Sequence, residues 1–291
     1  MKRWMPLDTA ALIFPAVRRE GWVNAFRVSA TLIAPVDPTL LQQAVEDLAP
    51  RFPSLYVKLR HGLFWYYLEQ APAPRVQQDY AYPLTFMSKK ELSACCLRVL
   101  YFENRIAVEF FHSLTDGNGG MVYLKTLTAR YLERKQAALS IPSAEGVRDW
   151  QAPPKPEELE DSFFRHSSKY ALARGEPNSY RLRGTPENGF LHLTTGILPA
   201  DRLVEAAHAQ GATVTVFLAA VMAQVLLEKQ QAEVPPTRQR PVKITVPVNL
   251  RKLYGSSTLR NFVLTLNPGV DPRLGTYTLR ELCDAIAAQL K

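Results

Sequence analysis

The pattern of apolar and polar residues predicts an ordered series of strands and helices in the first half of the chain. Residues 23–33 are rich in β-branched and apolar side chains, which is typical of a strand. Asp37 and Pro38 then form a helix-start signal, and apolar residues recur at helical spacing until Pro50. The elements expected after this helix are two strand hairpins over 54–69 and 97–111 and an amphipathic helix over 119–134.

Residues 138–188 differ from the sequence before them, because prolines interrupt a polar stretch that has little periodicity. Such a stretch is typical of a connection between two lobes. The regular pattern then resumes, and Thr213 can cap a helix that is apolar nearly all round and is therefore expected to be buried. The elements expected in this part are strands over 190–198, 243–249 and 262–266 and helices over 199–211, 213–230 and 277–290.

The composition is that of an ordinary globular protein, because 47% of the 291 residues are hydrophobic and 21% are charged. The formal net charge of +8 is compatible with attraction of an anionic partner such as a polyphosphate cofactor. The basic residues form scattered pairs, and no zinc-ligand spacing, basic heptad region or aromatic RNA-binding signature accompanies them. Nucleic-acid binding is therefore not expected.

Several features favour a cytoplasmic protein without a membrane span. Cys95, Cys96 and Cys283 give neither a disulfide framework nor a metal-ligand pattern, and there is no glycosylation sequon. The N-terminal apolar run lacks the small-residue cleavage site of a signal peptide. The longest apolar run, 214–227, is shorter than the roughly 18 residues that a membrane span needs.

The segment from Phe111 to Gly120 carries the most informative chemistry. Alternation along the preceding strand places His112 at the strand end, and a short polar loop with three glycines follows. Asp116 can cap the next helix, and the glycines let the backbone turn sharply. An imidazole has an unperturbed pKa of about 6.5, so a histidine presented in this way can act as a general base near neutral pH.

The residues His112 to Gly117, with the sequence HSLTDG, resemble the second half of the HHxxxDG motif of the chloramphenicol acetyltransferase-like superfamily. That superfamily includes bacterial alcohol acetyltransferases and condensation domains of nonribosomal peptide synthetases. The first histidine of the motif is replaced here by Phe111. Two further segments resemble the family in the same order along the chain, namely the helix and following residues 37–55 and the residues VPVNLR with NFV over 246–263.

The resemblance implies an α/β (α+β) fold in which two lobes combine mixed sheets with helices. The lobes would span 1–140 and 189–291, with 141–188 as the connection. Family members continue past the equivalent of Lys291, commonly with a D-F-G-W-G-like element that this sequence does not contain. The second lobe is therefore expected to be incomplete.

The resemblance also implies an enzyme that transfers an acyl group from acetyl-CoA or another acyl-CoA to an alcohol or amine, without a metal. His112 would be the general base, and Asp116 and Gly117 would hold its loop. Asp116 is expected to pair with an arginine, for which Arg51 and Arg251 are both candidates. The residues given a substrate-binding or loop role are Gly117, Asn249 and Arg251, and Asn249 is equally interpreted as a turn residue at a strand end.

Two other functions are compatible with the same resemblance. A condensation-like enzyme would take its acyl group from the thioester of an acyl carrier protein instead of from CoA. A catalytically inactive binding module would keep the fold without the reaction. The absence of the first motif histidine and the similarity to alcohol acetyltransferases favour the CoA-dependent enzyme.

Overall fold

The computed structural model describes residues 4–19, 22–79, 82–136, 144–166, 178–185 and 191–290. These residues form two compact units. Unit 1 contains the described part of residues 1–168 together with 191–192 and 249–262, and unit 2 contains 178–185, 193–248 and 263–290. The chain therefore returns from unit 2 to unit 1 twice, at 191–192 and over 249–262.

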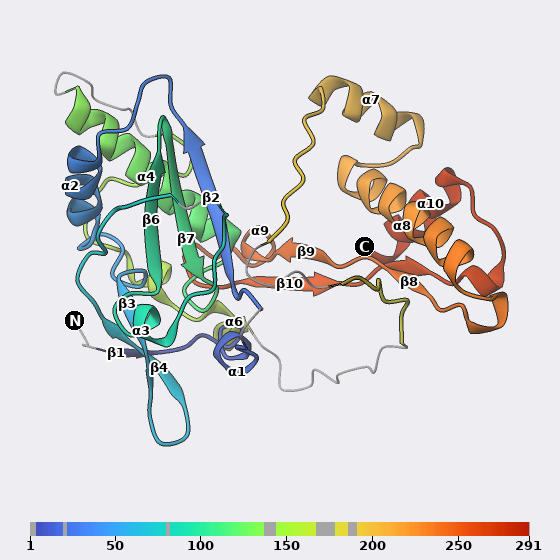
Figure 1. The fold of residues 1–291 in the computed structure, drawn as a ribbon, viewed down its shortest axis with the longest axis horizontal. Coiled ribbons are helices and arrows are strands. Elements are labelled where there is room, and N and C mark those ends of the chain that lie inside the picture. Colours follow the sequence, from blue (N-terminus) through green and yellow to red (C-terminus); the bar gives the residue numbers. More distant parts are fainter. Residues whose placement is uncertain are drawn as a thin grey trace. The chain divides into compact units, whose positions relative to one another are not determined.

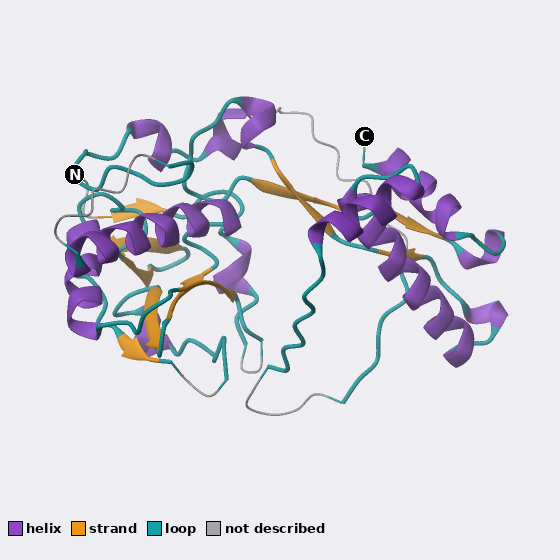
Figure 2. Ribbon diagram, turned by 90° about the horizontal axis from the view of Figure 1, so that it is seen from above, coloured by secondary structure: helices purple, strands orange, loops and turns teal. Residues whose placement is uncertain are grey.

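The main sheet of unit 1 has the strand order β2-β7-β6-β5. The pairs β2–β7 and β6–β7 are antiparallel, and the short β5 runs parallel to β6. Helix α4 packs against β2 and β7, and α2 packs against α4, so that helices cover one face of the sheet (Figures 1 and 2). These elements are β2 Ala25–Thr31, α2 Pro38–Leu48, β5 Gln77–Gln78, β6 Leu97–Phe102, β7 Arg105–Phe111 and α4 Gly117–Lys135.

A second sheet of unit 1 has the order β1-β4-β3 and is antiparallel throughout. Short helices complete the unit. The remaining elements of unit 1 are β1 Trp4–Pro6, α1 Ile13–Ala16, β3 Val57–His61, β4 Tyr66–Gln70, α3 Lys89–Leu92, α5 Pro156–Leu159, α6 Ser162–His166 and α9 Arg251–Tyr254.

Local signals predicted several of these elements well. The Asp37 carboxylate accepts hydrogen bonds from the N–H groups of Thr39 and Leu40, and Pro38 occupies the first turn of α2. The hairpin expected over 97–111 is also confirmed, with Glu103 at a positive φ of 48° in its turn.

The first predicted hairpin is shorter than expected at both strands. Strand β3 begins at Val57 instead of Ser54, because Tyr56 lies in a buried turn where its hydroxyl donates to the Val45 carbonyl and bonds to the Tyr123 hydroxyl. Strand β4 begins at Tyr66, and the apolar residues before it form an exposed loop. Apolar content alone therefore overestimated the strand length.

The first half of the predicted inter-lobe connection is part of unit 1. The Glu158 carboxylate is 3% exposed and accepts hydrogen bonds from Arg51 and from Arg148. The Arg130 guanidinium lies over the Trp150 ring, 3.9 Å from its centroid. These contacts attach 144–166 to unit 1, so the compact unit extends past the predicted boundary at residue 140.

The ion pairs of Glu158 should make unit 1 sensitive to acid. Burial by itself raises the pKa of Glu158, but hydrogen bonds from Arg51, from the Lys155 N–H and from Arg148 outweigh it and lower the pKa. A group with a lowered folded-state pKa stabilises the protein above its unfolded pKa, and this stability is lost as the pH falls through the folded value. We expect Glu158→Gln to reduce the unfolding free energy by about 2 kcal/mol at pH 7 and by much less near pH 3.

Urea unfolding followed by tryptophan fluorescence measures this effect, because all four tryptophans of the sequence lie in unit 1. Glu157→Gln is the matched control, since Glu157 is exposed beside Glu158 in unit 1 and forms no ion pair with the described residues. The control should show no difference at either pH. If Glu158→Gln reduced the unfolding free energy equally at both pH values, the ionised Glu158 carboxylate would not be what stabilises unit 1.

The described residues of unit 2 form α-helices and short strands. Helix α8 packs against α7 and α10, and the sheets are the pairs β8–β11 and β9–β10. The helices are α7 Ala200–Ala209, α8 Val214–Glu233 and α10 Leu279–Gln289, and two 3₁₀ turns span Pro236–Arg238 and Pro272–Leu274. The strands are β8 Val242–Lys243, β9 Val246–Asn249, β10 Val263–Leu266 and β11 Gly269–Val270. The last residue of β9 belongs to unit 1.

Two predictions for this part were wrong. Residues 191–198, the described part of the strand expected over 190–198, are not assigned to a strand. Helix α8 begins at its Thr213 cap as expected, but it is not buried all round. It buries small residues such as Ala220 and Ala223 against unit 2 and leaves Leu218, Met222 and Val225 exposed. Burial followed the available packing partners rather than the apolar composition of the helix.

In the part of the chain that the structure describes, no single helix is long and apolar enough to cross a membrane. Helices α7 and α8 satisfy the same length and composition test only when taken as a pair that is bent by 76°.

Candidate active site

His112 directly follows β7 and is held on both sides of its backbone. Its N–H donates to the Asn24 carbonyl at 2.9 Å, and its carbonyl accepts from the Asn261 side-chain amide at 3.1 Å. The imidazole stacks on Phe14 with ring centroids 4.3 Å apart and an angle of 9°, and Phe26 contacts it at 4.9 Å. Two aromatic rings and two backbone hydrogen bonds therefore fix the position of the ring.

The imidazole is only partly covered. His112 as a whole is half-buried, whereas its Nδ1 atom is buried and has no hydrogen-bond partner among the described residues. No carboxylate of those residues bonds to the ring. The described contacts of the imidazole are thus mainly aromatic.

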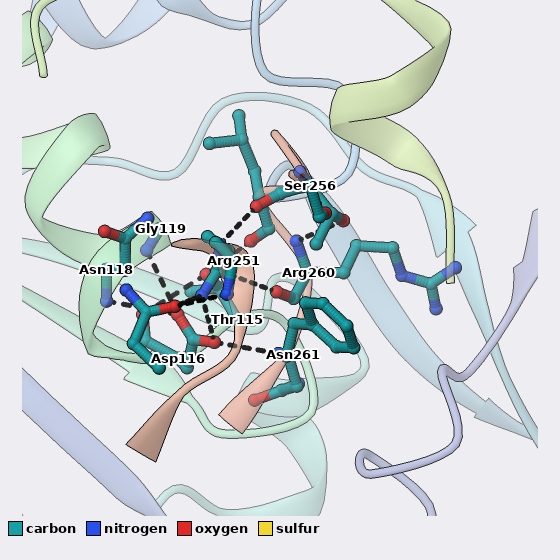
Figure 3. Close-up of polar contacts among 12 residues, drawn as sticks. Thr115, Asp116, Asn118, Gly119, Arg251, Ser256, Arg260 and Asn261 are labelled. Carbon is teal, nitrogen blue, oxygen red and sulfur yellow. Dashed lines mark hydrogen bonds and ion pairs between the residues drawn. The ribbon is translucent and has the colours of Figure 1, made fainter. Parts of the chain in front are cut away.

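Asp116 lies in the loop after His112 and accepts four hydrogen bonds with a carboxylate that is 3% exposed. One oxygen accepts from the N–H groups of Asn118 and Gly119 and so caps helix α4. The other accepts from Arg251 Nη1 and from the Phe262 N–H, both at 2.9 Å (Figure 3). The carboxylate therefore joins the His112 loop to the segment 249–262.

Arg251, and not Arg51, is the arginine that pairs with Asp116. Its guanidinium is 7% exposed and also donates to the carbonyls of Thr258 and Arg260 at 2.7 and 2.6 Å (Figure 3). Arg51 pairs with Glu158 instead. The two candidates that the sequence left open are thus separated by their tertiary contacts.

Asn249 supports Arg251 from its own chain segment. The side-chain oxygen of Asn249 accepts from the Arg251 N–H and from Arg251 Nη1, both at 3.1 Å. This is an Asx turn at the end of β9, and it orients the guanidinium. The contact agrees with the interpretation of Asn249 as a turn residue.

Asp8 and Asn261 are part of the same assembly, and the sequence did not single them out for it. The Asn261 amide that donates to His112 also donates to the Asp8 carboxylate at 3.2 Å, and the Ala11 N–H donates to that carboxylate at 2.7 Å. Burial raises the pKa of Asp8 and outweighs the opposing charge of Arg260 and the hydrogen bonds. No local pattern predicts this link, because its partners are about 250 residues apart.

Known structures resemble this chain over nearly its whole length. Polyketide synthase associated protein 5 from Mycobacterium tuberculosis aligns with a TM-score of 0.61 at 16% identity, covering 98% of this chain and 71% of that protein. The first condensation domain of the calcium-dependent antibiotic synthetase gives 0.64 at 15%, covering 99% and 74%. F. sporotrichioides TRI101, complexed with coenzyme A and T-2, gives 0.59 at 12%, covering 99% and 74%.

The chain has the chloramphenicol acetyltransferase-like fold. The mixed α/β architecture expected from the resemblance of the sequence is therefore confirmed. No protein-family model matches the chain, and no curated protein matches it by sequence. Among the described residues, no group of three or more His, Cys, Asp or Glu side chains could hold a metal ion.

In this acetyltransferase-like fold, position 119 of the loop after His112 has room only for glycine, whereas position 117 has room for a larger residue. A methyl group at Gly119 would collide with the Thr115 hydroxyl and the Leu259 carbonyl, which are hydrogen-bonded to each other at 2.6 Å. A methyl group at Gly117 would meet nothing within 4 Å, and Gly117 has no positive φ. The close approach of the 249–262 segment therefore limits the size of residue 119.

The two glycines provide a matched pair of variants. We expect Gly119→Ala to destabilise unit 1 by about 1–3 kcal/mol, because the rigid backbone of Leu259 must shift. Gly117→Ala should change the unfolding free energy by less than about 0.5 kcal/mol. Urea unfolding by tryptophan fluorescence gives both values, and equal stability of the two variants would exclude the proposed collision.

Proposed function

We propose that this chain transfers an acyl group from a CoA thioester to an alcohol or amine, with His112 as the general base. The observation that supports this most directly is the presentation of the imidazole, which is half-buried, stacked on Phe14 and fixed through its backbone by Asn24 and Asn261. A base must reach the proton it removes in a defined geometry, and these contacts provide one.

In the proposed reaction, an imidazole nitrogen of His112 accepts the proton of the acceptor O–H or N–H as that atom attacks the thioester carbonyl. The tetrahedral intermediate then collapses, the C–S bond breaks, and the imidazolium returns the proton to the leaving sulfur. The products are the ester or amide and free CoA thiol, and His112 is neutral again. General base assistance of this type contributes about a hundred- to ten-thousandfold to the rate.

Nε2 is the nitrogen that we assign to this step. Nδ1 is buried without a hydrogen-bond partner among the described residues, so it is the less accessible of the two ring nitrogens. A neutral imidazole that accepts a proton at Nε2 carries its own hydrogen at Nδ1.

Asp116 acts in this proposal as a positioning residue, because all four of its hydrogen bonds go to backbone N–H groups and Arg251. It holds the loop that follows the base and does not touch the imidazole. Asn249 and Arg251 belong to the same support of the loop. The replacement of the first motif histidine by Phe111 leaves this support intact, since the Phe111 side chain is 2% exposed in the core.

Two observations support CoA as the donor. One structural relative was crystallised with coenzyme A, and the positive net charge of the chain favours a phosphorylated donor. The similarity to condensation domains supports the second candidate, in which an acyl carrier protein delivers the thioester. The third candidate, an inactive binding module, would keep the same fold without turnover.

A thiol-release assay tests the proposal. The chain is incubated with acetyl-CoA and a panel of alcohols and amines, and free thiol is detected with a chromogenic disulfide. Acceptor-dependent thiol release supports the proposed function. Release from an acylated carrier protein but not from acyl-CoA would favour the second candidate, and binding without any release would favour the third.

A further inference from the structure

Five arginines from three separate segments of unit 2 line one hollow. Its volume is about 930 Å³, and Tyr180 and Thr237 are among its lining residues. We call it the arginine hollow, and its arginines are Arg181, Arg183, Arg238, Arg240 and Arg273.

Among the described residues, most of these arginines form no ion pair. Arg273 pairs with Asp271, but no carboxylate of the described residues lies within 4 Å of the guanidinium nitrogens of the other four arginines. Glu233 is the one acidic residue in the lining, and Lys229 and the Tyr180 hydroxyl already bond to it. In unit 1, by contrast, arginines typically lie in ion pairs, including Arg27, Arg98, Arg130 and Arg134.

The backbone that carries these arginines is anchored. The Gln230 side chain is 1% exposed, and it donates to the Arg240 carbonyl at 2.9 Å and accepts from the Arg240 N–H at 2.8 Å. The Tyr180 N–H donates to the Pro241 carbonyl at 2.9 Å and so fixes the segment of Arg181 and Arg183 beside that of Arg240. The protein therefore holds like charges together, although their repulsion costs free energy.

A ligand with clustered negative charge would offset this repulsion. Guanidinium groups bind phosphate through two parallel N–H···O bonds, and several of them can share a group of phosphates. The volume of the hollow lies within the range of small-molecule sites, about 300–1,000 Å³, which favours a small ligand over an extended chain.

We propose that the arginine hollow binds a small organic compound that carries clustered phosphate groups. The nucleotide end of a CoA thioester and a free nucleoside triphosphate both have this chemistry. The first source rests on the proposed acyl transfer, whereas the second is independent of it. The hollow contains no residue of the His112 site, so binding there can be measured without turnover.

Titration calorimetry with CoA, ATP, inorganic tripolyphosphate and phosphate-free pantetheine tests this proposal. CoA, ATP and tripolyphosphate are the probes, and pantetheine is the uncharged control. The double variant Arg181→Gln/Arg238→Gln removes two unpaired charges from different segments. Arg202→Gln is the matched control, because Arg202 is also exposed in unit 2 but pairs with Glu205 outside the hollow.

We expect the phosphate compounds to bind, pantetheine not to bind, and the double variant to weaken binding by about tenfold or more. Arg202→Gln should bind as the wild type does, and binding should weaken as salt is raised. Tighter binding of CoA than of ATP would identify the CoA thioester as the ligand of the hollow. Equal or tighter binding of ATP would identify a free nucleotide as its ligand. Absence of binding at millimolar ligand, equal affinity of the double variant, or binding of a DNA oligonucleotide alone would overturn the proposal.

Discussion

Replacement of His112 by alanine should lower the rate of acyl transfer by about a hundred- to ten-thousandfold, while the chain stays folded. The imidazole of His112 is half-buried and is held by its stacking on Phe14. Its removal leaves substrate binding and the thioester unchanged but takes away the acceptor for the proton. The decrease should therefore lie in kcat, with a smaller change in KM.

Two controls make this result specific. His61→Ala removes a histidine that is exposed at the end of β3, and thiol release should be unchanged. Phe14→Leu keeps the imidazole but removes the ring stacked on it, and it should lower kcat less than His112→Ala does. Transfer that persisted at the wild-type rate in a folded His112→Ala protein would refute the assignment of the base.

Replacement of Asp116 by alanine should destabilise unit 1 by about 3–5 kcal/mol, because it leaves the buried Arg251 guanidinium without its carboxylate. The change also removes the cap of α4 and the acceptor of the Phe262 N–H. Stabilities of whole domains are about 5–15 kcal/mol, so this loss should be visible as a large shift of the urea midpoint. Tryptophan fluorescence follows it.

A double-mutant cycle separates the ion pair from the other bonds. Arg251→Met should also reduce the unfolding free energy of unit 1, since the buried Asp116 carboxylate then loses one of its hydrogen-bond donors. The double variant Asp116→Ala/Arg251→Met should lose clearly less than the sum of the single changes. Arg165→Ala breaks the exposed pair with Glu160 in unit 1 and should cost less than about 1 kcal/mol. Strictly additive effects of Asp116 and Arg251 would rule out their coupling.

The agreement between sequence and structure is best where the determinants are local. The Asp37-Pro38 start of α2 and the Glu103-Asn104 turn act within a few residues, and both were predicted with correct positions. Strand 190–198 and the buried character of α8 were predicted from apolar content alone, and these predictions were wrong. Apolar residues need a partner surface before they become a strand or a core helix.

The sequence by itself determined the order of the local elements, the place of His112 at a strand end and the helix-capping role of Asp116, because each depends on residues close together in the chain. Only the tertiary structure decided that Arg251 pairs with Asp116, that Asn261 links Asp8 to His112, and that 249–262 belongs to unit 1. These contacts join segments more than a hundred residues apart. Spacing along one chain does not encode which distant segments pack together, since many pairings satisfy the same local pattern.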